Sequence, residues 1–592
     1  MALWLYGLDY YGPMSRIARL LSLALLVSSL GATALAAPPK SDLPDNSNLD
    51  GNLFYEILIG EMLARSDDPA SAYANILDAA RRANSERLYE RAVEIAYGAR
   101  NGDWALEAAQ SWARAFPSSR EANRLHLQIL LGLNRVADTQ EPLKRELASL
   151  SSSEKVVAIG LLPRYFARVT DKKQAIAVVE KVLAPELNQH ATGAAAWAAI
   201  GTLRLQAEDV DGAMEAMRRG VALDAESDAP ILLAIALIDA KTPAAEAAVN
   251  HYLASGKPSA DARMAYARHL INAQRYPDAY VQMRRLTEEQ SRYPEAWLMR
   301  GSLELQDGRL ALAEDSLKHY VSLATPDADT GAEAETGRGL VQAYILLAQV
   351  AEQGQRFDEA LAYLDKINSP ADALRVERRR ASILVRQGHL DQGRAAIRGV
   401  PELQSSDGLA KINAEVQLLR DTRHYADAYE LLRDAVPRYP DDIDLLYDLA
   451  MMAERLGKND EMEQLLRKVM EIKPDYHHAY NALGYSLAER NIRLNEARQL
   501  IQQALTYAPD DPFIVDSLGW VEFRAGNSAE ALRLLQGAFQ SRPDAEIAAH
   551  LGEVLWTMGR HDQAGAIWKE GEQLNPQNET LRDTMRRLRG KP

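Results

Sequence analysis

The chain has 592 residues, more than one compact core accommodates, so it must fold as several domains or as an array of repeats. Its composition, 47% hydrophobic with only 7 Phe and many Ala and Leu, is typical of helices in close contact. The formal charge of −15 argues against non-specific binding to nucleic acid or anionic lipid. The chain contains no Cys, which excludes disulfides, thiol catalysis, thiolate zinc sites and a lipid attached to Cys.

The N-terminus has the pattern of an export signal. Arg16 and Arg19 supply positive charge, residues 20–30 form an apolar core, and Ala34-Leu35-Ala36 supplies small residues for cleavage. The apolar run is too short for a comfortable membrane span, although an uncleaved anchor is the alternative. We therefore predict a signal peptide cleaved near Ala36 and a mature protein that is periplasmic and carries no lipid.

Two further features concern this terminus. The segment ahead of Met14 does not fit a signal peptide, so Met14 is our predicted true start of the signal over residues 1–36. Residues 37–51 are polar and rich in Pro, which predicts a flexible leader. No other stretch approaches the length of an apolar membrane span, so we predict no transmembrane segment in the mature chain.

One skeleton of small residues and prolines recurs about every 34 residues in the C-terminal part of the chain. Gly484, Gly519 and Gly552 follow one another at steps of 35 and 33 residues. Similar steps separate three alanines and five prolines: Ala497, Ala531, Ala564, Pro440, Pro474, Pro509, Pro543 and Pro576. Three sets of markers with one period indicate repeats, each of which buries its apolar face by stacking on the next.

The residue types predict a pair of helices in each repeat. The Gly permits close approach on the first helix, the Ala lies where the second helix crosses it, and the Pro ends the second helix. The segment from Arg524 to Ser528 exemplifies the turn between them, with Gly526 at the C-cap and Asn527 or Ser528 at the next N-cap.

This skeleton resembles the tetratricopeptide repeat. The residues that carry the resemblance are Tyr480, Leu483, Gly484, Ala497, Ala504 and Pro509, and then Leu518, Gly519, Ala531, Ala538 and Pro543. It is strongest over residues 409–576, and its small mid-repeat position can be followed upstream to Ala72. The resemblance implies an all-α, right-handed superhelical solenoid of about 15 helix-turn-helix repeats between Asn52 and Pro576.

Irregular segments divide the predicted solenoid. We expect the following parts: a degenerate N-terminal array over residues 52–190, a middle array over 191–400 with an acidic insertion over 324–338, a regular C-terminal array over 401–576, and a capping helix and tail over 577–592. The last segment is polar, as the open end of a repeat array requires.

We find no motif that carries chemistry. The sequence lacks GxSxG, HExxH and GxxxxGK[ST]. His477 and His478 are adjacent, so on a helix they point in different directions and suit a helix surface better than a metal site. Four carboxylates between Asp327 and Glu335 leave open a weak calcium site, against a solvated acidic loop. We predict a protein that is not an enzyme and uses no cofactor or metal.

In this family the first helix of each repeat lines a concave groove. Carried onto this sequence, the groove positions hold Tyr447, Met451, Arg455, His478, Asn481, Tyr485, Glu489, Phe513, Asp516, Trp520, Arg524, Glu553 and Trp556. Aromatic residues interspersed with charge are typical of binding hot spots, so we predict a protein-binding groove with Trp520 and Trp556 exposed in it. The alternative is that both Trp side chains pack between helices. Asn481 alone matches the family's clamp for a terminal carboxylate, so a C-terminal peptide is not our predicted ligand.

An exported chain made of such repeats is similar to a proteobacterial outer-membrane lipoprotein that serves a periplasmic carboxyl-terminal processing protease as an adaptor. That resemblance implies a non-enzymatic scaffold that presents cell-wall hydrolases to the protease. The adaptor has a lipidated Cys that this chain lacks, so a membrane tether would be missing or replaced.

Three alternatives stay open. The chain could instead be a scaffold for envelope or polysaccharide assembly, or a cytoplasmic co-chaperone-like module whose N-terminus is misread. A sugar transferase that carries such repeats is disfavoured, because no non-repeat block exceeds about 50 residues, which leaves no room for a catalytic domain.

Overall fold

The computed structural model describes residues 50–66, 68–238, 242–255, 258–325 and 337–590. Within these ranges every regular element is a helix, and no strand occurs. The predicted signal peptide, nearly all of the predicted leader and the four candidate calcium carboxylates lie outside the described residues.

The chain divides into two compact units, residues 1–245 and residues 246–592, and each has its own helix stack. The helices of the first unit are α1 (Gly51–Ala64), α2 (Pro69–Ala83), α3 (Glu86–Gly98), α4 (Gly102–Ala115), α5 (Arg120–Gly132), η1 (Val136–Thr139), α6 (Gln140–Ala148), α7 (Ser152–Tyr165), α8 (Lys172–Leu183), α9 (Gly193–Gln206), α10 (Val210–Leu223) and α11 (Asp228–Ala236). Helix α12 (Pro243–Ala254) crosses the division.

The second unit begins with the rest of α12. Its further helices are α13 (Ala260–Asn272), α14 (Tyr276–Glu289), α15 (Pro294–Gln306), α16 (Leu310–Ala324), α17 (Arg338–Gln353), α18 (Phe357–Leu364), η2 (Pro370–Asp372), α19 (Ala373–Arg386), α20 (Leu390–Arg398), α21 (Asp407–Asp421), α22 (Tyr425–Ala435), η3 (Val436–Arg438), α23 (Ile443–Arg455), α24 (Asn459–Ile472), α25 (His477–Glu489), α26 (Leu494–Tyr507), α27 (Pro512–Arg524), α28 (Ser528–Ser541), α29 (Ala545–Thr557), α30 (His561–Leu574) and α31 (Glu579–Arg589).

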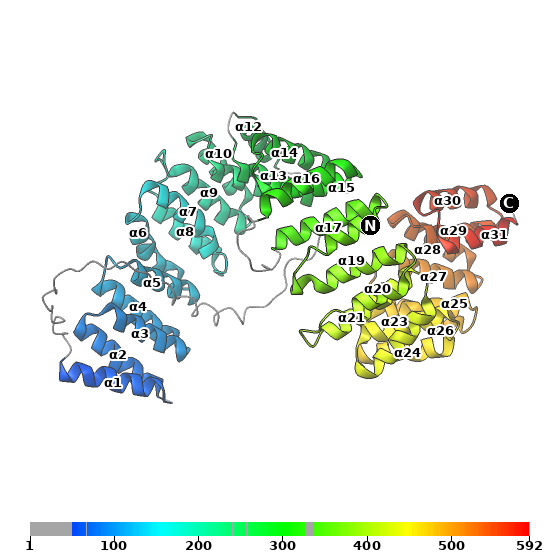
Figure 1. Ribbon diagram of the computed structural model, residues 1–592, viewed down its shortest axis with the longest axis horizontal. Helices are drawn as coiled ribbons and strands as arrows, with labels where there is room; N and C mark the ends of the chain where they lie inside the picture. Colours follow the sequence, from blue (N-terminus) through cyan, green and yellow to red (C-terminus); the bar gives the residue numbers. More distant parts are fainter. Residues whose placement is uncertain (1–49, 67, 239–241, 256–257, 326–336, 591–592) are drawn as a thin grey trace, which may run out of the picture. The chain divides into compact units, whose positions relative to one another are not determined.

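From α13 to α30 each odd-numbered helix packs on the even-numbered helix that follows it, as first and second helices of a repeat do. The same holds for α1 with α2, α3 with α4, α5 with α6 and α9 with α10, whereas α7 packs on α9, and α11 packs on α9 and α10. The single helix α31 follows the last of these pairs in the described residues. Figure 1 shows adjacent helices of each unit lying side by side. The all-α repeat architecture predicted from the sequence is therefore confirmed.

Short turns with defined caps separate the helices. The side chain of Asp511 accepts a hydrogen bond from the backbone N–H of Phe513 at 2.8 Å and starts α27. Gly526 has a φ of +88°, the left-handed conformation that favours Gly and ends a helix. Asn527 follows at the N-cap position of α28 but makes no cap; its side-chain amide donates to Glu522 at 2.6 Å instead.

The repeating small residues lie where paired helices meet. Ala531 is fully buried on α28, and a Cβ atom built on Gly519 of α27 would lie 2.7 Å from Cγ of Leu535 on α28. A Cβ on Gly552 of α29 would lie 2.0 Å from the indole nitrogen of Trp568 on α30. These glycines bring the two helices of a repeat closer than any side chain would permit.

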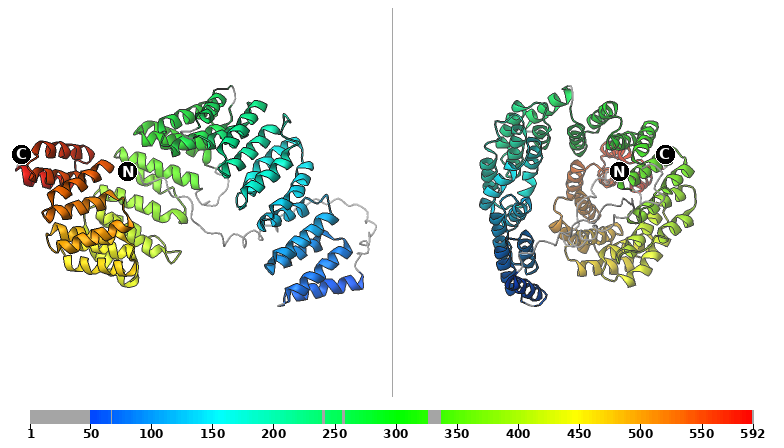
Figure 2. Two further views of the ribbon diagram at one scale, coloured as in Figure 1. Left: turned by 180° about the vertical axis from the view of Figure 1, so that it is seen from behind. Right: turned by 60° about the vertical axis from the view of Figure 1, so that its left-hand side comes forward.

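The second unit curves so that distant repeats come together, as the views in Figure 2 illustrate. The side chain of Arg423, just after α21, forms an ion pair of 2.9 Å with Glu579 at the start of α31. Closer to the centre of the curve, the hydroxyl of Tyr485 on α25 lies 3.2 Å from Nε2 of His550 on α29. First helices that are two repeats apart therefore touch.

Candidate protein-binding surface

The predicted groove residues come from the first helices of four consecutive repeats, α23, α25, α27 and α29. The exposed members are Arg455, His478, Glu489 and Phe513. The half-buried members are Tyr447, Met451, Asn481, Tyr485, Arg524 and Trp556. The buried members are Asp516, Trp520 and Glu553. The surface is therefore accessible at some positions and closed at others.

The closed part is organised around His550, an α29 residue that is almost fully buried. Its Nδ1 lies 2.9 Å from Oδ2 of Asp516, and its ring stacks on the indole of Trp520 at 4.4 Å between centroids. The hydroxyl of Tyr485 reaches its Nε2 from the other side. We call Tyr485, Asp516, Trp520 and His550 the central cluster. It fills the space between α25, α27 and α29 with the protein's own side chains.

The prediction that Trp520 is exposed in the groove is wrong. Its side chain is 3% exposed, and its indole N–H donates to Glu489 at 2.8 Å. The physical reason is the curvature of the unit, which brings α29 over the face of α27 and covers the indole with His550. Asp516 is buried for the same reason.

Trp556 is half-buried and contacts its own repeat. Its ring lies 4.2 Å from His561 and 5.5 Å from Trp568, both on α30. The expected exposure in the groove is thus replaced largely by packing between α29 and α30. The carboxylate of Glu553 already has a partner within the protein, since it accepts a hydrogen bond from Arg587 of α31 at 2.5 Å.

The sequence reasoning missed His550, although the repeat period could have found it. Asn481 and Asp516 are 35 residues apart, and His550 follows Asp516 after 34 residues. The three residues therefore occupy one position in successive repeats, and extending that column by one repeat leads directly to His550.

Burial and charge together set the protonation of the central cluster. Burial opposes a charge on His550, but the carboxylate of Asp516 outweighs it by Coulomb attraction and a hydrogen bond, so the pKa of His550 is raised. Burial, reinforced by Glu489, raises the pKa of Tyr485 well above its usual range. The Asp516 carboxylate therefore favours the cationic form of the imidazole, beside a phenol whose raised pKa keeps it neutral.

The accessible part of the surface is aromatic. The ring of Tyr447 lies 5.6 Å from Tyr476 and 6.4 Å from His478, and Tyr476 lies 5.5 Å from His478. Phe513, in the first turn of α27, is exposed beneath the guanidinium of Arg542 at 5.0 Å. We call Tyr447, Tyr476, His478 and Phe513 the aromatic rim. These side chains belong to α23, to the start of α25 and to the start of α27.

Carboxylates accompany the aromatic rim. Burial raises the pKa of Asp448 and Glu454 on α23, which means that water solvates these groups poorly. Burial also raises the pKa of Tyr447 to about 12. Asp448 already pairs with Arg420 at 3.1 Å, and Ser486, Arg455 and Arg490 lie near Glu454.

The line of Tyr485 hydroxyl, His550 imidazole and Asp516 carboxylate has the order of a nucleophile, a base and an orienting acid. A nucleophile needs a lowered pKa or a neutral base beside it, whereas the pKa of Tyr485 is raised and the raised pKa of His550 favours its cationic form. The arrangement therefore suits structural cohesion better than catalysis.

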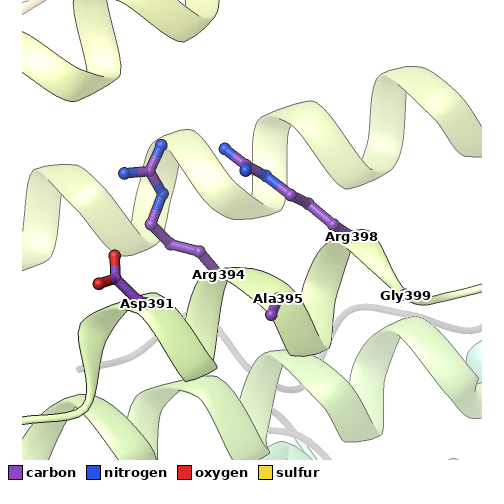
Figure 3. Close-up of a pocket in the computed structure, with 5 residues that line it drawn as sticks. All are labelled: Asp391, Arg394, Ala395, Arg398 and Gly399. Atoms are coloured by element: carbon purple, nitrogen blue, oxygen red, sulfur yellow. The ribbon is translucent and has the colours of Figure 1, made fainter.

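Two pockets lie away from these residues. One, of about 520 Å³, is lined by Asp391, Arg394, Ala395, Arg398 and Gly399. Figure 3 shows the arginine side chains extending from α20 toward the neighbouring helix, where both guanidinium groups donate to Glu415 at 2.7 Å. The other, of about 350 Å³, is lined by residues 289–293. Neither includes a predicted groove residue.

Two absences concern the described ranges alone. They contain no group of three or more His, Cys, Asp or Glu residues placed to hold a metal ion. They also contain no helix whose length and apolar character would let it cross a membrane.

Comparisons with known proteins agree with this architecture. Family models of the tetratricopeptide repeat match residues 443–476 and residues 517–579. The chain therefore contains tetratricopeptide repeats over these residues, and its described residues form an all-α array of stacked helices. Proteins built from such repeats typically bind other proteins through extended surfaces and do not act as enzymes.

Three relatives share part of the sequence. The TPR repeat-containing protein PA4667 of Pseudomonas aeruginosa is 32% identical over 248 residues, which is 42% of this chain and 42% of that protein. Cellulose synthase 2 operon protein C of Komagataeibacter xylinus is 27% identical over 160 residues, 27% of this chain and 12% of that protein. Protein O-mannosyl-transferase TMTC1 of Homo sapiens is 25% identical over 181 residues, 29% of this chain and 20% of that protein. Each match spans less than half of the relative's own length.

Proposed function

We propose that this protein is a non-enzymatic periplasmic scaffold that binds protein partners, and that it acts as an adaptor that presents cell-wall hydrolases to a carboxyl-terminal processing protease. Stacked repeats hold a long surface in one conformation before a partner arrives, which lowers the entropy lost on binding. The export pattern at the N-terminus supports the location.

The observation that carries the proposal is the aromatic rim. Tyr447, Tyr476, His478 and Phe513 come from three successive first helices and stay at least partly accessible, while the neighbouring central cluster is closed. Aromatic side chains contribute most to hot spots because they bury large areas at a low cost in conformational entropy. The rim therefore replaces Trp520 as the proposed anchor for a partner.

The charge of the rim indicates which partner segments fit. Glu454 is a poorly solvated carboxylate on α23, Asp448 is another that pairs with Arg420 at 3.1 Å, and the whole chain carries a formal charge of −15. A segment with Lys or Arg beside an apolar residue would pair with these carboxylates and cover the aromatic rings. We propose such a segment as the ligand of the rim.

A second candidate function is a scaffold for the synthesis or export of an envelope polysaccharide. The likeness to a cellulose synthase operon protein supports it, over 12% of that relative's length. A transferase activity is not part of the proposal, because the likeness to TMTC1 covers 20% of that enzyme and no residues outside the repeats form a catalytic domain in the described chain.

The test is affinity capture from an envelope extract, followed by titration of each captured protein against the purified chain. A His478→Ala, Phe513→Ala double variant should weaken binding at least tenfold, since each substitution removes an exposed ring and leaves the core intact. Tyr507→Ala is the matched control, because Tyr507 is an exposed aromatic residue on α26, a second helix.

The captured proteins distinguish the two functions. A processing protease together with cell-wall hydrolases supports the adaptor, and polysaccharide synthases or export proteins support the second candidate. Equal loss of binding in the control and in the rim variant would show that the rim is not the binding surface.

A further inference from the structure

Helix α1 exposes an apolar stripe at the N-terminal end of the first unit. Its members are Phe54, Tyr55, Leu58 and Met62, whose exposed fractions lie between 44% and 63%. Steps of four residues from 54 to 58 to 62 place these side chains on one face of the helix. The opposite face is apolar too, since Leu53 and Gly60 are buried against α2. A helix that is apolar on both sides is typical of a buried position.

The other end of the repeat array is different. The exposed residues of α31 are all charged: Glu579, Arg582, Asp583, Arg586, Arg587 and Arg589. Such a polar face is what a terminal repeat needs in order to end a stack in water. Helix α1 has no equivalent polar face in the described residues. In the mature chain that the predicted cleavage would leave, residues 37–49 contain only Leu43 and Leu49 as large apolar residues.

The charges around the stripe are neutralised or placed at its ends. Glu56 pairs with Arg82 at 2.9 Å, and Glu61 pairs with Arg91 at 2.6 Å, which lowers the pKa of Glu61. The exposed residues of α1 itself include no carboxylate. Asp50 caps the beginning of the helix and Arg65 caps its end, and both are exposed.

From this arrangement we infer that α1 docks against α1 of a second copy of the chain, with the two helices antiparallel and centred on Leu58. In that register Leu58 meets Leu58 of the second copy and Phe54 meets its Met62. Asp50 is the neighbour of Gly51, the residue that faces Arg65 of the second copy. Phe54, Leu58 and Met62 lie symmetrically about Leu58, so this part of the stripe serves both copies, as a twofold contact requires. The end charges attract, and no like charges meet despite the net charge of −15 on each chain.

The size of the stripe sets the strength of the contact. Four side chains at these exposures offer about 400 Å² per copy, roughly half of the 800 Å² that each partner contributes to a standard interface. The dimer is therefore weak and reversible, with a dissociation constant on the order of micromolar or above. It forms at high local concentration and separates on dilution.

The first experiment uses the absence of Cys in the natural chain. The purified protein with Leu58→Cys should form a disulfide-linked dimer under mild oxidation, because the two Leu58 Cα atoms lie about 6 Å apart in this register. Phe54→Cys alone should not, since the two Phe54 positions lie about 15 Å apart. A mixture of Phe54→Cys and Met62→Cys chains should cross-link. Equal cross-linking of all single-Cys chains, or none in any, overturns the inference.

Sedimentation velocity over a range of concentrations supplies a second measurement without a new thiol. Leu58→Asp should raise the dissociation constant at least tenfold, since two carboxylates would meet at the twofold axis. Val157→Asp is the matched control, because Val157 is 66% exposed on α7, away from the stripe, and circular dichroism verifies the fold of both variants. A monomer at every concentration overturns the inference. So does a dimer that Leu58→Asp leaves intact, or a stripe that binds neutral phospholipid vesicles in place of a second copy.

Discussion

His550 Nδ1 lies 2.9 Å from Asp516 Oδ2, so an imidazole from α29 and a carboxylate from α27 form an ion pair away from solvent. Tyr485 of α25 meets the same imidazole at 3.2 Å. Through these contacts the first helices of three successive repeats are joined directly, in addition to the stacking within and between neighbouring repeats. The centre of the concave face is therefore part of the core.

The first prediction concerns pH and His550. Because the pKa of His550 is raised above the ordinary value of about 6.5, its pairing stabilises the fold fully below that value, and the contribution is lost as the pH rises through the folded pKa. Besides Asp516, the groups that face it are Tyr485 and Glu489 from α25 and Glu546 from α29. Hydrogen exchange of peptides from α25, α27 and α29 should therefore show less protection at about pH 9 than at about pH 6.

The control for this prediction is His550→Gln. At about pH 6 the amides of α25, α27 and α29 should be less protected from hydrogen exchange in the variant than in the wild type. The loss of protection between about pH 6 and about pH 9 that the wild type shows should be smaller in the variant. If wild type and variant change in parallel with pH, His550 does not titrate as described.

The second prediction concerns His126 on α5 and has the opposite sign. Burial, reinforced by Arg145, lowers the pKa of His126 to about 4, and neither ring nitrogen has a hydrogen-bond partner among the described residues. As the pH falls from about 6.5 to about 4, His126 becomes protonated in the unfolded chain but stays largely neutral in the folded chain. The free energy of unfolding of the first unit therefore falls by about 3 kcal/mol. His126→Leu should remove this loss in urea unfolding at acid pH. An unchanged slope of stability against pH in the variant would contradict the prediction.

The third prediction concerns Trp520. Trp520→Ala should lower the free energy of unfolding by about 3–5 kcal/mol, since it leaves a cavity beside His550 and Phe523 in a buried site. Trp520→Phe keeps a ring in place and should cost less, mainly through the lost hydrogen bond to Glu489. The free energy of unfolding of both variants can be measured by chemical denaturation. A Trp520→Ala protein of normal stability that fails to bind partners would restore Trp520 as a binding anchor.

The fourth prediction compares two glycines in the C-terminal repeats. Gly552→Ala should destabilise the protein by about 1–3 kcal/mol, because the added Cβ meets the indole of Trp568. Gly537→Ala should stabilise it by about 0.5–1 kcal/mol, since Gly537 lies within α28 with nothing near the added Cβ. Thermal unfolding distinguishes the two. Equal effects would mean that the close approach of α29 and α30 does not depend on Gly552.

Much of the local architecture could be predicted from the sequence because its causes are local. Gly526 requires a left-handed turn wherever it lies, and Pro509 and Pro543 each follow the last residue of a second helix by two positions. The candidate site was harder to predict. Helical phase places Trp520 on the inner face of α27, but phase alone does not tell whether another helix covers that face.

The period, the alternation of helices and the small residues that let them cross can all be derived from the sequence, because they depend on side chains within one repeat or its neighbour. Which inner-face residues reach solvent follows only from the three-dimensional arrangement of several repeats. That outcome depends on the curvature summed over several repeats, which brings His550 onto Trp520 and Tyr485 but leaves His478 and Phe513 accessible. A small rotation per repeat is set by the packing of whole helices, and no single residue in the sequence reports it.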